Sequence, residues 1–126
     1  SVCQVRRERS NTPLQALVTL NDPVYMEAAQ ALARRMVAAG GDTVAGRIRQ
    51  GYRLCLGRSP TEEEVGRLAG FHARSLERFR ADGAKALDVA TKPLGAAPAG
   101  VEVPELAAWT MVGNVLLNLD EMLMKR

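Results

Sequence analysis

The chain has 126 residues, of which 47% are hydrophobic and 25% charged; this suits one globular domain and excludes a disordered chain. Aromatic residues make up only 4%, so we expect a core of Leu, Val, Ala and Met. The net charge of +3 indicates an anionic partner only weakly, and no apolar run is long enough to span a membrane.

Two helix starts are marked in the first part of the chain. Thr12-Pro13-Leu14-Gln15 places Thr at an N-cap, Pro at the first helical position and Gln three residues after the cap, which predicts a short helix over 13–20. Asp22-Pro23 repeats this pattern and predicts a second helix that Gly40-Gly41 ends. Its apolar stripe is Tyr25, Ala29, Leu32 and Met36.

Two more helices follow. The third is expected from about Asp42 to Leu56, where Gly57 stops it. A capping box at Thr61 to Glu64 opens the fourth, which Gly83 weakens although the helix can resume through Leu87. Four glycines fall inside these two helices and mark either close helix approach or tolerated losses of about 1 kcal/mol each; they are Gly46, Gly51, Gly66 and Gly70.

The end of the chain holds a connection and a last helix. Residues 92–103 are rich in Ala, Gly and Pro and are expected to form a flexible connection. Pro104-Glu105 then opens a helix with a narrow apolar seam: Trp109, Val112, Leu116, Leu119 and Leu123. No run alternates with a period of two, so the sequence predicts an all-α fold without a sheet. We expect about five helices in a compact irregular bundle, forming a single domain over 1–126.

The sequence holds no catalytic constellation and no cofactor or metal motif. Cys-x-x-Cys-His is absent, one His is too few for a zinc site, and phosphate loops and nucleophile elbows are missing. His72, on an apolar helix face, is either a ligand for a cofactor of another domain or a core histidine with one hydrogen bond; we favour the latter. The start of a helix explains Glu62–Glu64 without catalysis.

The basic segment before the first helix is the strongest candidate for an interaction. Arg6, Arg7 and Arg9 can bind a phosphate or a carboxylate. We favour internal or interdomain pairing over nucleic acid, because a longer basic face and aromatic platforms are missing. The segment is therefore predicted to meet residues 118–121 in space. The candidate interaction residues are Arg6, Arg7, Arg9, Asn11, Thr12, Gln15, Asn21, Asp22, Asn118, Asp120 and Glu121.

Residues 6–17, followed by Leu20-Asn21-Asp22-Pro23, resemble the C-terminal part of planctomycete-specific domain one, also called domain of unknown function fifteen-fifty-three. Later sequence motifs at 53–64, 105–110 and 116–121 also resemble this family and occur in the same order. The resemblance implies a C-terminal structural or interaction module of a longer exported or periplasmic bacterial protein. Its partners would be the upstream domains, where haem c can be carried by a cytochrome-c-like domain.

No catalytic residue carries over from this family. Two alternatives remain open. The chain could complete an interdomain active site of a polysaccharide-related enzyme, with Arg9, Asn11 and Gln15 as anion or sugar contacts. It could also bind nucleic acid weakly through its basic arm, although no nucleic acid is expected as a partner.

Overall fold

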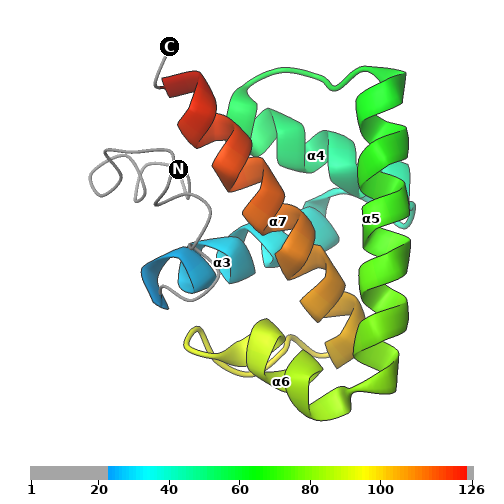
Figure 1. The fold of residues 1–126 in the computed structure, drawn as a ribbon, viewed down its shortest axis with the longest axis vertical. Helices are drawn as coiled ribbons and strands as arrows, with labels where there is room; N and C mark the ends of the chain where they lie inside the picture. Colours follow the sequence, from blue (N-terminus) through cyan, green and yellow to red (C-terminus); the bar gives the residue numbers. More distant parts are fainter. Residues whose placement is uncertain (1–22, 125–126) are drawn as a thin grey trace.

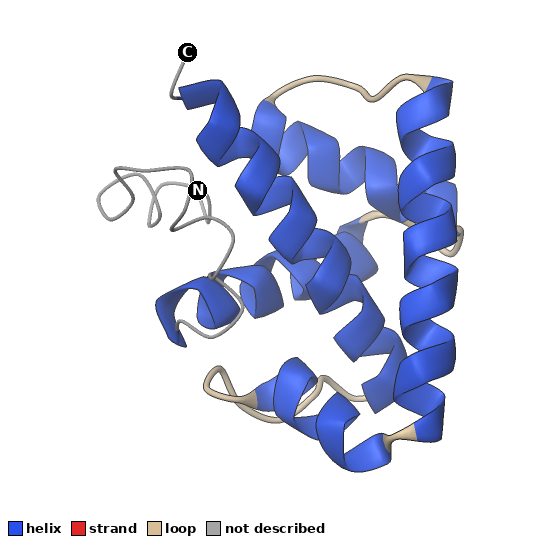
Figure 2. Cartoon of the chain, in the orientation of Figure 1, coloured by secondary structure: helices blue, strands red, loops and turns tan. Residues whose placement is uncertain are grey.

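The computed structural model describes the backbone of residues 23–124 and the side chains of 24–120. This range contains five α-helices and no strand (Figure 2), which confirms the all-α prediction. The helices are α3 (Pro23–Ala39), α4 (Val44–Leu56), α5 (Glu62–Ala81), α6 (Gly83–Thr91) and α7 (Val103–Met124). The helix predicted over 13–20 lies outside the described residues.

Helix α7 forms the centre of the fold. Figure 1 shows it crossing the middle of the molecule, and it contacts all four of the other helices. Five consecutive residues, 106–110, are buried, which a single stripe on a helix cannot explain. The prediction of a narrow seam was therefore wrong in extent, because the neighbouring helices cover α7 on several sides. Fully buried Trp109 is the largest side chain of this core.

The helix ends follow the capping residues of the sequence. The Thr61 hydroxyl accepts from the Glu64 amide at 3.1 Å, and the Glu64 carboxylate accepts from the Thr61 amide at 2.8 Å. This reciprocal pair is the predicted capping box of α5. Thr43 caps α4, so that helix begins at Val44, two residues after the predicted start at about Asp42. Gly57 ends α4 with φ of 71°, a left-handed conformation that suits glycine.

Helix α6 is separate from α5. Asp82 ends α5 with φ of −137° and ψ of 84°, and its carboxylate accepts from the Lys85 amide at 3.1 Å as the N-cap of α6. The predicted resumption through Leu87 occurs, but it continues to Thr91 as a new helix. The turn lays α6 beside the start of α7 (Figure 1).

Hydrogen bonds from side chains of α3 hold the first residues of the connection after α6. The side-chain amide of fully buried Gln30 makes three hydrogen bonds. It donates to the carbonyls of Val89 (2.7 Å) and Lys92 (2.6 Å) and accepts from the Leu94 amide (3.1 Å). Arg34 donates to the carbonyls of Ala90 and Gly95. The connection contains a turn but no helix, and the flexibility expected of 92–103 stays a prediction.

Candidate functional site

His72 lies between α5 and α7 and is 4% exposed. Its Nε2 is 3.1 Å from Oε2 of Glu105, so the carboxylate can accept the ring N–H. The imidazole also packs on the indole of Trp109, with centroids 4.2 Å apart. The preferred interpretation of His72 as a core histidine with one hydrogen bond is confirmed. Together these three residues join the middle of α5 to the first turns of α7.

Arg58 and Glu64 form a second polar contact, between the end of α4 and the start of α5. Two hydrogen bonds of 3.0 Å join the guanidinium to the carboxylate. The Arg58 hydrogen bond and the Thr61 backbone hydrogen bond lower the pKa of Glu64 from 4.5 to about 2. The guanidinium also lies 5.2 Å from the ring centroid of Tyr52, whose pKa burial raises. These contacts stabilise the connection between the end of α4 and the start of α5.

Metal-binding side chains are not gathered in this part of the fold. Among the described side chains, no three His, Cys, Asp or Glu residues lie together as a candidate metal site. The Cys55 thiol is buried and donates to the carbonyl of Leu116 at 3.5 Å. Within the described helices, none is long and apolar enough to cross a membrane.

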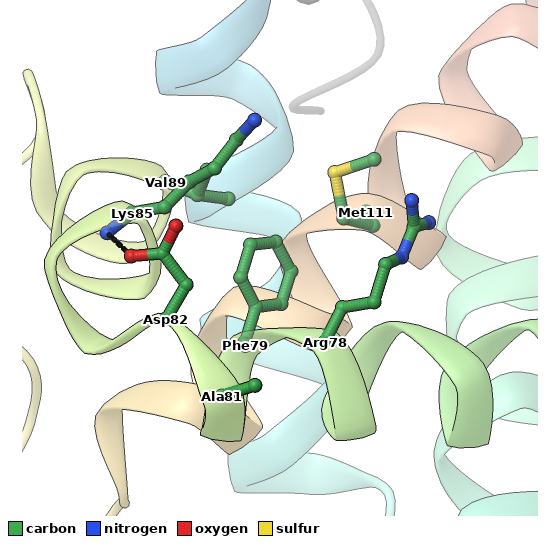
Figure 3. A pocket seen from close by; sticks show the side chains of 7 residues that line it. All are labelled: Arg78, Phe79, Ala81, Asp82, Lys85, Val89 and Met111. Carbon is green, nitrogen blue, oxygen red and sulfur yellow. Dashed lines mark hydrogen bonds between the residues drawn. The ribbon is translucent and has the colours of Figure 1, made fainter.

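Two surface hollows are lined entirely by side chains that the structure describes. The first, here called the Phe71 hollow, has a volume of about 350 Å³ and lies between α4, α5 and α7. Its lining is Tyr52, Glu64, Arg67, Leu68, Phe71, Val115 and Leu119. The second, here called the Phe79 hollow, has a volume of about 410 Å³ and lies between α5, α6 and α7. Its lining is Arg78, Phe79, Ala81, Asp82, Lys85, Val89 and Met111 (Figure 3).

Most of the candidate interaction residues lie outside the described range. Asn118 and Asp120 are both in the last part of α7. The side-chain amide of Asn118 donates to the backbone carbonyl of Asn114 at 3.0 Å. Asp120 is 5% exposed. The side chain of Glu121 is not among those described. Outside the described residues lie Arg6, Arg7, Arg9, Asn11, Thr12, Gln15, Asn21 and Asp22. Their predicted meeting with residues 118–121 stays a prediction.

Sequence reasoning missed both Gln30 and the Phe79 hollow. Gln30 lies about 100° round the helix from Ala29, off the predicted apolar stripe, so its position did not indicate burial. The sequence held no signal for the hollow either. The approach of Met111 and Val89 to Phe79 depends on how three helices pack.

These features define a small all-α domain in which buried and half-buried polar groups join one helix to the next. The chain belongs to the family described as PSD1, a protein of unknown function (DUF1553), whose family model matches residues 1–72. The match ends at His72, so the resembling phrases at 105–110 and 116–121 lie outside it. No curated protein and no solved structure matches the chain.

Proposed function

We propose that this domain is a structural and interaction module at the C-terminal end of a larger exported, cytochrome-c-associated bacterial protein. The observation that carries the proposal is the Phe71 hollow. Its floor includes Leu68, Val115 and Leu119, which is apolar surface left open at the meeting point of three helices. Burial of exposed apolar surface lowers the free energy, so the hollow suits a contact with another domain.

The hydrogen bonds beside the hollow support the same proposal. The Arg58–Glu64 pair and the capping box hold the joint between α4 and α5 beside it. A docking surface built on fixed helices loses little conformational entropy on binding. The partner we propose is the domain that precedes this one in the parent protein. Any haem c would belong to that domain, because this chain has no Cys-x-x-Cys-His.

The test uses the chain and the upstream polypeptide as two separate proteins. Their association is measured by titration calorimetry, and haem absorbance is recorded for the upstream protein. Phe71→Glu replaces an apolar ring in the hollow by a charge and is expected to weaken association by about tenfold or more, since a carboxylate is costly to bury in an apolar contact. Ala73→Glu adds the same charge at an exposed position of α5 and is the matched control.

Circular dichroism and the Trp109 emission establish that each variant is folded. The proposal fails if the two folded wild-type proteins do not associate. It also fails if Phe71→Glu and Ala73→Glu bind the upstream protein equally well. Association without haem in the upstream protein would keep the interaction module and remove the cytochrome from the proposal.

The basic segment forms a further part of this proposal. Asp120 is buried, and a buried carboxylate stays charged only with favourable partners. We propose that one of Arg6, Arg7 and Arg9 is among the charged partners of the Asp120 carboxylate. In a double-mutant cycle, Arg9→Ala and Asp120→Asn should then show a coupling energy of about 1–3 kcal/mol in urea unfolding. Coupling near zero for all three arginines would contradict the pairing.

A further inference from the structure

We propose that the Phe79 hollow binds small carboxylates that carry an aromatic ring or a branched aliphatic group. This site is separate from the Phe71 hollow and does not depend on the proposed docking function. Its floor, rim charges and volume each point to this ligand class.

The floor of the hollow is apolar and comes from three helices. Phe79 of α5 is 7% exposed, Val89 belongs to α6, and Met111 belongs to α7. The volume of about 410 Å³ lies in the range of small-molecule sites. Methionine adapts its shape and contacts aromatic rings favourably, so the floor suits a ring or a branched chain.

The rim of the hollow carries two cations. Arg78 and Lys85 lie on either side of the Phe79 ring in Figure 3. Neither has an ion pair within 4.0 Å among the described side chains. Asp82 is the third charged residue, and one of its carboxylate oxygens already accepts from the Lys85 amide. The rim therefore has a net charge of about +1, which complements one carboxylate.

The Phe71 hollow provides an internal comparison. Its carboxylate, Glu64, is held by two hydrogen bonds from Arg58, and its cation, Arg67, lies 3.9 Å from Glu63. Glu64 and Arg67 carry opposite charges, so the charges that line that hollow sum to zero. Both hollows have apolar floors, but the charged side chains at their rims differ. Only the Phe79 hollow should therefore bind an anionic ligand more tightly than its neutral analogue.

The experiment titrates the full 126-residue chain with 1-naphthoate and with the neutral analogue 1-naphthalenemethanol. Binding is followed by calorimetry and by chemical-shift changes of the Met111 methyl group. We expect saturable 1:1 binding of 1-naphthoate, with the neutral analogue weaker by about tenfold, as expected for the loss of one charge-assisted hydrogen bond. The Met111 methyl signal should shift in the same titration.

Two variants, both changed at exposed positions, separate the site from general surface charge. Arg78→Gln combined with Lys85→Gln should abolish the preference for the anion. Arg74→Gln removes an exposed arginine one turn earlier on α5 and should leave binding unchanged. The proposal is overturned if 1-naphthoate shows no saturable binding to the folded chain or if the neutral analogue binds equally well. It is also overturned if Arg74→Gln weakens binding as much as the double variant does.

Discussion

The imidazole of His72 lies against the indole of Trp109, with ring centroids 4.2 Å apart and planes inclined by 34°. We expect His72→Ala to lower the free energy of unfolding by about 2–4 kcal/mol, because it leaves a cavity beside a fully buried ring and removes the hydrogen bond to Glu105. Urea unfolding measures the loss. Trp109 is the only tryptophan, so its fluorescence reports the transition directly.

Glu77→Ala is the control for this substitution, since Glu77 is exposed on the same helix. It should change the unfolding free energy by no more than about 0.5 kcal/mol. Equal stability of His72→Ala and Glu77→Ala would contradict a structural role for the stacked histidine.

Gly46 and Gly66 should respond in opposite directions to alanine. A Cβ added at Gly46 would lie 2.5 Å from the Gly40 carbonyl oxygen, whereas one at Gly66 meets nothing within 4 Å. We expect Gly46→Ala to destabilise the fold by about 1–3 kcal/mol through overpacking. Gly66→Ala should stabilise it by about 0.5–1 kcal/mol through helix propensity. Thermal unfolding of the two variants compares them, and a gain in stability from Gly46→Ala would be incompatible with this geometry.

Glu64 should make the stability depend on pH in the acid range. Its pKa is lowered to about 2 in the folded chain, from 4.5 without these contacts, so the folded state favours the ionised carboxylate. The stabilisation is present above about pH 4.5 and is lost as the pH falls towards 2. Glu64→Gln should flatten this decline in urea unfolding midpoints measured from pH 5 to pH 2.

Glu63→Gln is the control for the pH experiment. Glu63 is one residue earlier on α5 and is largely exposed, and its ion pair with Arg67 is long at 3.9 Å. This variant should keep the acid dependence of the wild type. An unchanged decline in Glu64→Gln would show that other groups control acid stability.

Gln30 should be essential for the connection after α6. Gln30→Glu preserves the shape of the side chain but removes the donor for the Val89 and Lys92 carbonyls and brings a carboxylate beside them. We expect a loss of about 2–4 kcal/mol, since a buried charge and two unmatched acceptors result. The carboxylate can still accept from the Leu94 amide, so faster hydrogen exchange at that amide would report opening of the destabilised connection. Glu27→Gln, an exposed change on the same helix, should leave both measurements unaltered.

The helix boundaries at Thr61 and Gly57 were predicted because their causes are local. Thr61 and Glu64 are three residues apart. The same spacing joins Asp82 to Lys85, but this cap was not predicted, because α5 and α6 were expected as one interrupted helix. Gly57 ends α4 through its own backbone conformation. A capping side chain needs no distant partner, so its effect can be read along the chain.

The helix packing and the candidate ligand site could not be predicted in this way. Gln30 finds its carbonyl acceptor 59 residues away, and His72 finds Glu105 33 residues away. The same polar side chain would be solvated if the helices packed differently, and α7 is buried on several sides only because four helices enclose it. Local chemistry thus accounts for which segments are helical and where they end. Contacts between distant segments select the buried faces and form both hollows, because burial depends on what another helix brings to the same place.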